Sequence, residues 1–162
     1  MITLDIKDLY VNLPTKNLLH ITEFWLNGCN HDPVTTEHIL YLLKIILKQN
    51  YFQYNNQFYQ PNKGIAMGSP ISGTLAEIYL QYLEEIFVKH CLENKEITYY
   101  KRYVYDLLII LDQNKISADT IYSVINNIDK SLEFKISQEE NNTINYLDLS
   151  FNRTAINVEL NI

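Results

Sequence analysis

Ile-Thr-Tyr-Tyr-Lys-Arg-Tyr-Val-Tyr-Asp-Leu-Leu-Ile-Ile-Leu-Asp is the sequence of residues 97–112. Apolar and aromatic residues fill both halves of this stretch, and the polar break near Tyr105 and Asp106 is typical of a turn between two strands. We therefore predict a β-hairpin with Asp106 at its tip. A charged residue in a turn most often bonds nearby amides, so Asp106 alone assigns no chemistry.

The amino-terminal residues predict another strand. Residues 2–6 alternate apolar and polar side chains, as a half-buried strand does, and Asp5 lies near the end of the run. Pro14 then stops regular strand pairing. An aspartate that closes a strand is, like Asp106, more often a turn residue than part of a site.

Apolar residues at spacings of three and four predict helices in the rest of the chain. The first runs from about residue 15 to a stop at Gly28, and the second begins at a cap on Thr35 or Thr36 and reaches residue 50. Two more are predicted, one capped by Ser69 and Pro70 and ending near residue 93, and one capped by Ser117 that includes Leu132.

Two asparagine pairs predict tight turns, because asparagine tolerates positive φ. Asn55 and Asn56 lie inside a tyrosine-rich stretch and predict a hairpin, and Asn141 and Asn142 lie between further strands. The order of strands and helices shows no repeat and no linker. It predicts a single α+β domain over residues 1–162.

Composition limits the class of protein. The chain has 162 residues, 47% of them hydrophobic, which suits one domain with its own core. Its 13 basic and 19 acidic residues give a net charge of −6, which argues against a surface that grips nucleic acid everywhere. Cys29 and Cys91 are far apart in the sequence, and we predict that both thiols are reduced and buried. Without a signal peptide or a membrane-spanning segment, we expect an intracellular protein with no membrane partner.

Four segments, taken in order, resemble the reverse transcriptase family, most closely the branch found in Penelope-like retroelements. Residues 4–14, Leu-Asp-Ile-Lys-Asp-Leu-Tyr-Val-Asn-Leu-Pro, resemble its first catalytic motif, and residues 64–72, Gly-Ile-Ala-Met-Gly-Ser-Pro-Ile-Ser, resemble the second. Residues 102–106, Arg-Tyr-Val-Tyr-Asp, occupy the place of the Tyr-Val-Asp-Asp motif. Phe134-Lys135-Ile136 and the later Tyr-Leu-Asp-Leu of residues 146–149 resemble the segment that follows.

The resemblance implies a palm-type antiparallel sheet backed by helices, and RNA-directed DNA polymerase activity. The family transfers a nucleotide to a primer 3′-hydroxyl with two Mg²⁺ ions held by carboxylates. By similarity, Asp5 and Asp106 would be catalytic residues and metal ligands, with the Ile6 carbonyl as a further ligand. The implied partners are an RNA template, a DNA primer and deoxynucleoside triphosphates.

The resemblance also implies substrate-binding residues. Tyr10 would lie against the sugar of the incoming nucleotide, although an ordinary core tyrosine explains this residue equally well. The loop residues Gly64, Met67, Gly68 and Ser69 would contact the nucleotide and the template, because glycine allows close backbone approach. The alternative interpretation is that this loop, residues 64–69, only caps the helix that follows it.

Two departures from the family pattern count against catalysis. Tyr105 replaces the first aspartate of the paired carboxylates, and a neutral phenol cannot replace a carboxylate as a Mg²⁺ ligand. By the same resemblance, we expect the fingers that precede the first motif and the thumb that follows the palm to be largely absent. We therefore expect an impaired reverse transcriptase palm fragment that is inactive alone. The alternatives are a decayed, non-catalytic retroelement remnant and an α+β module that binds protein or nucleic acid.

Overall fold

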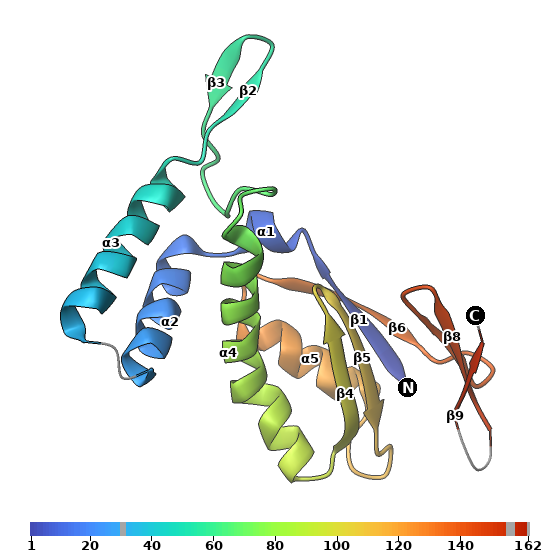
Figure 1. Ribbon diagram of the computed structural model, residues 1–162. Helices are drawn as coiled ribbons and strands as arrows, with labels where there is room; N and C mark the ends of the chain where they lie inside the picture. The colour runs from blue at the N-terminus through green and yellow to red at the C-terminus, as the bar shows by residue number, and fades with distance from the viewer. Residues whose placement is uncertain (30–31, 155–157, 162) are drawn as a thin grey trace. The chain divides into compact units, whose positions relative to one another are not determined.

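The computed structural model describes residues 1–29, 32–154 and 158–161. Figure 1 shows the mixture of helices and antiparallel strands, which confirms the predicted α+β class. The chain divides into two compact units. Residues 1–7 and 83–162 form the first unit, and residues 8–82 form the second.

A four-stranded antiparallel sheet is the centre of the first unit. Its strands are β1 (Ile2–Lys7), β4 (Ile97–Tyr103), β5 (Asp106–Leu111) and β6 (Glu133–Gln138), in the spatial order β4-β5-β1-β6. The predicted strand at residues 2–6 and the predicted hairpin at residues 97–112 are both confirmed. Because β1 is central, its residues have partners on two sides, in β5 and in β6.

The two faces of β1 differ in burial. Ile2, Leu4 and Ile6 are buried, whereas Thr3 and Asp5 are partly exposed on the other face. Helix α5 (Ala118–Ile128) packs beside β6, where the Asn126 side-chain oxygen accepts a hydrogen bond from the Phe134 N–H at 3.0 Å.

Helix α5 begins as predicted but ends early. The Ser117 hydroxyl caps it by accepting from the Thr120 N–H at 3.1 Å. The prediction that the helix includes Leu132 is wrong, because the helix ends at Ile128 and Asp129 has extended backbone angles. Leu132 is still buried, so its apolar character reflects packing after the helix rather than helical periodicity.

A small sheet follows, formed by β7 (Thr143–Tyr146), β8 (Leu149–Arg153) and β9 (Val158–Asn161). The predicted asparagine turn before it is confirmed, with φ of 50° at Asn141 and 63° at Asn142. This sheet covers part of the central sheet through an apolar cluster. Its members come from the amino terminus, β5, β7 and β8: Met1, Leu108, Ile110, Ile144, Tyr146 and Phe151.

The second unit contains α1 (Leu9–Asn12), α2 (Thr15–Gly28), α3 (Pro33–Lys48), a hairpin of β2 (Phe52–Tyr54) and β3 (Gln57–Tyr59), and the first part of α4 (Ser72–Glu93). Figure 1 shows the hairpin extending past the end of α3. Its turn is as predicted, with φ of 48° at Asn55 and 59° at Asn56.

Two helix starts in this unit differ from the prediction. Helix α3 begins at Pro33, because Asp32 caps it by accepting from the N–H groups of Val34 and Thr35 at 2.9 and 3.1 Å. Helix α4 begins at Ser72 rather than at Ser69 and Pro70, which lie in the turn before it.

The single turn of α1 was not predicted. It begins after Asp8, whose φ of 49° breaks the extended run of β1. Among the described residues, no helix has the length and apolar character that crossing a membrane requires.

Candidate active site

Asp5 and Asp106 lie directly opposite each other on neighbouring strands of the central sheet. Opposed residues of an antiparallel pair project from the same face, with Cβ atoms about 4.5–5.5 Å apart. Both side chains are partly buried. Burial and then the negative charge of Asp5 raise the pKa of the Asp106 carboxyl above its usual value. The structure therefore brings together two carboxylates that lie 101 positions apart in the sequence.

Tyr105 lies in the tight turn between β4 and β5, next to this pair. Its backbone carbonyl accepts a hydrogen bond from the Ile6 N–H at 3.0 Å, which ties the turn to β1 just after Asp5. The phenol side chain is 45% exposed. Asp106 is the first residue of β5 rather than the tip of the hairpin, so the tip is Val104 and Tyr105.

Val104 has an unusual backbone conformation for its type. Its φ is 53°, in the left-handed region that a β-branched residue rarely adopts. Such strain persists only where surrounding structure enforces it, and here the Tyr105 carbonyl is bonded to β1. No sequence signal marked Val104, because glycine or asparagine is the usual residue at such a turn.

Two further residues extend the row formed by Asp5 and Asp106. Tyr103 of β4 lies opposite Asp106, and Lys135 of β6 lies opposite Asp5. The same face therefore carries Tyr103, Asp106, Asp5 and Lys135 across four strands. Lys135 could have been found from the alternation of Phe134-Lys135-Ile136, which predicts a polar side chain facing away from the buried side of the sheet.

Tyr146 supports the carboxylate pair from the small sheet. Its hydroxyl donates a hydrogen bond to the backbone carbonyl of Asp106 at 3.2 Å, and its side chain is buried. Burial and then the charge of Asp106 raise the pKa of this phenol, so it stays protonated and able to donate.

The donor atoms on this face fit one divalent cation better than two. Mg²⁺ is commonly held by one or two carboxylates together with substrate phosphates, and Asp5 and Asp106 supply two. A bridged pair of ions needs a further carboxylate between them. Among the described residues, no cluster of three or more His, Cys, Asp or Glu side chains could hold a metal. Tyr105, which precedes Asp106 in the chain, supplies a phenol in place of a third carboxylate.

The residues of the second motif lie in the other unit, together with Tyr10. Gly64 has a φ of 79°, and a Cβ atom there would lie 2.4 Å from the Val11 carbonyl oxygen and 2.6 Å from that of Tyr10. The next residue, Ile65, donates its N–H to the Tyr10 carbonyl at 2.8 Å. Gly64 thus allows residues 64–65 to approach the backbone of α1 closely. This contact between two segments of the chain fixes the position of the α1 backbone.

The remainder of the loop is more open. Met67 is 77% exposed, and Gly68, with a φ of 91°, has free space where a side chain would begin. The Ser69 carbonyl accepts from the Ser72 N–H at 3.1 Å, and the Ser72 hydroxyl donates to the Ala66 carbonyl at 2.6 Å. These two bonds fix the loop at the start of α4.

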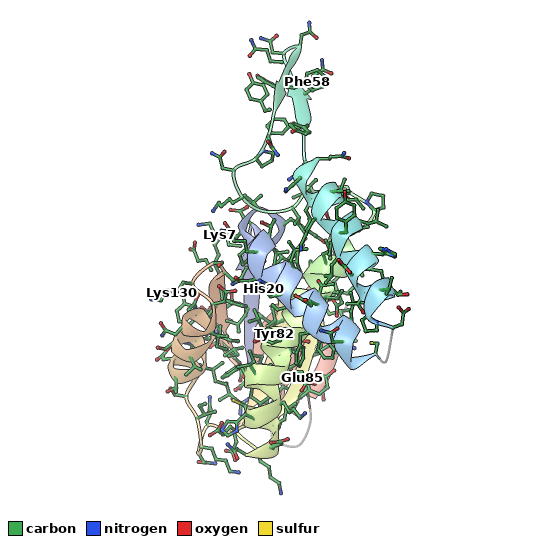
Figure 2. The ribbon with its side chains drawn as sticks, turned by 90° about the vertical axis from the view of Figure 1, so that its left-hand side faces the viewer. Lys7, His20, Phe58, Tyr82, Glu85 and Lys130 are labelled. Carbon is green, nitrogen blue, oxygen red and sulfur yellow. The ribbon has the colours of Figure 1, made fainter. Side chains whose placement is uncertain are left out.

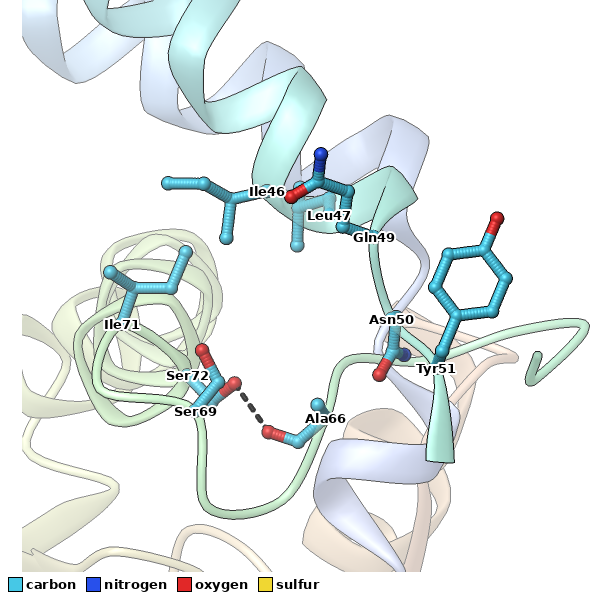
Figure 3. A pocket seen from close by; sticks show the side chains of 9 residues that line it. All are labelled: Ile46, Leu47, Gln49, Asn50, Tyr51, Ala66, Ser69, Ile71 and Ser72. Atoms are coloured by element: carbon cyan, nitrogen blue, oxygen red, sulfur yellow. Dashed lines mark hydrogen bonds between the residues drawn. The ribbon is translucent and has the colours of Figure 1, made fainter. Parts of the chain in front are cut away.

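A pocket of about 190 Å³ lies beside this loop within the second unit. Figure 3 shows residues from the end of α3 facing residues of the loop and of the start of α4 across it. Its lining is mixed, with apolar side chains from both sides and hydroxyls from Ser69 and Ser72: Ile46, Leu47, Gln49, Asn50, Tyr51, Ala66, Ser69, Ile71 and Ser72.

Comparison with known proteins finds likeness in structure and not in sequence. No protein-family model matches the chain, and no curated protein matches it. Among solved structures, apo telomerase from Candida tropicalis, truncated from the C-terminal domain, matches 99% of the chain with a TM-score of 0.72 and 17% identity. Telomerase from Candida albicans, in complex with a TWJ fragment of telomeric RNA, matches 99% with a TM-score of 0.69 and 15% identity.

The likeness covers only part of those enzymes. The chain spans 35% of the first telomerase chain and 30% of the second. At these identities the comparison concerns the fold. The chain thus has the fold of a segment of telomerase, which is a reverse transcriptase-related enzyme.

Proposed function

We propose that this chain is a palm domain of the reverse transcriptase type, close to that of Penelope-like retroelements, whose catalysis is impaired by Tyr105. The observation that carries the proposal is the direct opposition of Asp5 and Asp106 on neighbouring strands, beside a hairpin turn, in a fold shared with telomerase. Two partly buried carboxylates facing each other are costly unless a cation or a proton offsets their charge.

In this proposal Asp5 and Asp106, with the Ile6 carbonyl, would hold Mg²⁺. Such an ion would supply charge neutralisation at the triphosphate and at the attacking primer oxygen. Tyr10 would face the sugar of the deoxynucleotide, and Met67, Gly68 and Ser69 would line the path of nucleotide and template. Gly64 would act indirectly, because its close contact fixes the backbone of Tyr10.

The proposed partners are an RNA template, a DNA primer and deoxynucleoside triphosphates. The telomerase from Candida albicans is in complex with an RNA fragment, which supports a nucleic-acid partner in general. In the proposal, residues 1–162 supply the palm, and the fingers and thumb come from other segments.

Tyr105 is the reason to expect impairment. A carboxylate at this turn would complete a set of three beside Asp5 and Asp106, and a neutral phenol does not. A non-catalytic binding module is the second candidate, and it is favoured because the described residues include no cluster of three or more His, Cys, Asp or Glu side chains that could hold a metal.

Primer extension on an RNA template with Mg²⁺ tests the proposal. We expect no incorporation by the natural sequence. Tyr105→Asp should incorporate measurably once the fingers and thumb segments are supplied with it, and Asp5→Asn should abolish that activity again. Incorporation by the natural sequence would show that Tyr105 does not impair the site. Failure of Tyr105→Asp to incorporate with those segments supplied, and with its fold intact by circular dichroism, would favour the binding module.

A further inference from the structure

The β2–β3 hairpin has a composition unlike the rest of the chain. We call residues 51–60, Tyr-Phe-Gln-Tyr-Asn-Asn-Gln-Phe-Tyr-Gln, the aromatic hairpin. Half of its residues are aromatic and none is charged. Every residue of both strands is exposed, including Phe58 at 76% and Tyr54 at 71%. Figure 2 shows these side chains standing out on both sides of the strands.

The register sorts the aromatic side chains onto two faces. Phe52 lies opposite Tyr59 and Tyr54 lies opposite Gln57, so these four side chains share one face. The rings of Phe52 and Tyr59 are stacked, with centroids 5.5 Å apart and planes 21° apart. Phe58 projects from the opposite face. Each face of the hairpin therefore carries aromatic rings together with a glutamine amide, Gln57 on one face and Gln53 on the other.

Such a surface is costly to leave in water. A two-stranded hairpin without a packed layer is marginally stable alone, and its aromatic rings gain from being covered. The Asn55–Asn56 turn and a hydrogen bond at the base, from the Gln60 amide to the Lys48 carbonyl at 2.9 Å, hold it in place. Packing within the hairpin explains the stacked pair of Phe52 and Tyr59 but not the exposed rings of Tyr54 and Phe58.

The charge around the hairpin indicates what covers it. Residues 38–76 contain no aspartate or glutamate, although the whole chain carries a net charge of −6. The same stretch contains three lysines, Lys44, Lys48 and Lys63. Lys48 is the last residue of α3, at the point where the hairpin is anchored, and Lys44 lies one turn before it. An uncharged aromatic surface with lysines at its base is complementary to a negatively charged polymer whose flat rings can stack on it.

We propose that the aromatic hairpin binds single-stranded nucleic acid. Bases stack on Phe58, the most exposed ring of the aromatic hairpin, and nearby amides bond base edges. Lys44 and Lys48 neutralise phosphates of the same strand. This goes beyond the proposed function, because stacking on the hairpin requires neither Asp5 nor Asp106 nor a metal ion.

Fluorescence anisotropy with labelled oligonucleotides tests the proposal on the full chain. The probes are oligothymidylate and oligouridylate of about 15 nucleotides, within the range that such sites cover. The buffer contains EDTA, so the result is independent of nucleotidyl transfer. Phe58→Ala should weaken binding about 5- to 150-fold, the usual effect of losing one stacked base. Phe24→Ala is the matched control, because Phe24 is 63% exposed on α2, and it should bind as the natural sequence does.

Two more variants separate stacking from apolar docking. Phe58→Trp keeps a flat ring and should preserve binding, whereas Phe58→Leu keeps only the apolar character and should lose it. Lys44→Gln with Lys48→Gln should make the salt dependence shallower, by about 0.7 per lost phosphate contact. Comparison of the two oligonucleotides tells whether the hairpin prefers RNA or DNA.

Three results would overturn the proposal. The first is equal binding by Phe58→Ala and Phe58→Trp, and the second is equal loss of binding in Phe58→Ala and Phe24→Ala. The third is a protein dimer, seen by sedimentation without nucleic acid and abolished by Phe58→Ala, which would assign the surface to self-association.

Discussion

Replacing Asp106 with asparagine should stabilise the folded chain at pH 7. Asp106 faces Asp5 across β1 and β5, and it is partly buried. Like charges directly opposite each other on a sheet cost about 0.2–1 kcal/mol. Asp106 is a better choice than Asp5, because Asp5 also lies opposite Lys135 and its removal would cost an attraction. Asp106→Asn should therefore raise the free energy of unfolding by up to about 1 kcal/mol, or the melting temperature by up to about 4 °C.

The gain should depend on pH in a defined direction. Folding raises the pKa of Asp106 above its ordinary value of 3.8, because burial and Asp5 disfavour the charged form. Ionised Asp106 therefore costs stability at pH 7, and the cost falls as the pH falls through the raised pKa. The stabilisation by Asp106→Asn should be largest near neutral pH and should shrink toward about pH 4.

Urea unfolding followed by circular dichroism at several pH values measures this effect. Asp148→Asn is the control, because Asp148 is exposed in the turn between β7 and β8 and its replacement removes the same charge. Destabilisation by Asp106→Asn at pH 7 would refute the reasoning. A gain that matches the control, or one that does not change with pH, would refute it too.

Three other predictions concern backbone strain and thiol chemistry. Gly64→Ala places a Cβ atom 2.4 Å from a backbone oxygen and should lower the free energy of unfolding in urea by several kcal/mol. The control Gly73→Ala, which has open space in α4, should leave that free energy unchanged or raise it by about 0.5–1 kcal/mol. Val104→Gly should lower the rate of thermal unfolding or leave it unchanged, because glycine adopts a φ of 53° at no steric cost. A clearly higher rate of unfolding would contradict the strain inferred at Val104. Ellman's reagent at about pH 8 should label Cys29 rapidly, because this thiol is exposed and not buried as the sequence predicted. Cys91 should react only after unfolding, because burial raises the pKa of its thiol to about 11; rapid labelling of two thiols would contradict this.

Local signals predicted much of the fold. The Asn55–Asn56 turn follows from the tolerance of asparagine for positive φ, and the β4–β5 hairpin follows from two apolar runs with a polar break. Helix starts were harder, because several residues near one start could serve as the cap. At α3 the sequence offered Thr35 and Thr36, but Asp32 followed by Pro33 is the stronger combination.

Long-range pairing explains what could not be predicted. The position of β1 between β5 and β6 depends on packing, and no local pattern around Asp5 specifies Lys135 as a neighbour. The hydrogen bond from Tyr146 to the Asp106 carbonyl likewise joins segments 40 positions apart. The order of the motifs predicted that Asp5 and Asp106 lie together. The alternation around Lys135 predicts which face of its strand it occupies, but its pairing with Asp5 and the contact of Tyr146 with Asp106 depend on the tertiary fold.

The role of Gly64 shows a different limit. Its sequence context predicts a close backbone approach, and that approach exists. The partner is the backbone of Tyr10 and Val11, which a reading of the loop alone does not reveal. A conformational requirement can thus be inferred from a residue type, but the atoms that impose it depend on the tertiary fold.

Divalent-cation binding by Tyr105→Asp tests the central claim most directly. The claim is that Tyr105 occupies the place of a metal-binding carboxylate beside Asp5 and Asp106. Titration with Mn²⁺, followed by electron paramagnetic resonance, measures the affinity of the natural sequence, of Tyr105→Asp and of Tyr99→Asp. Tyr99 is a matched control, because it is 47% exposed on β4 and its replacement adds the same charge.

We expect Tyr105→Asp to bind Mn²⁺ about tenfold more tightly than the natural sequence, as a third carboxylate ligand should allow. Asp5→Asn in the same variant should remove the gain, and Tyr99→Asp should show none. Equal Mn²⁺ affinity in Tyr105→Asp and the natural sequence would contradict the claim that this turn belongs to a metal site.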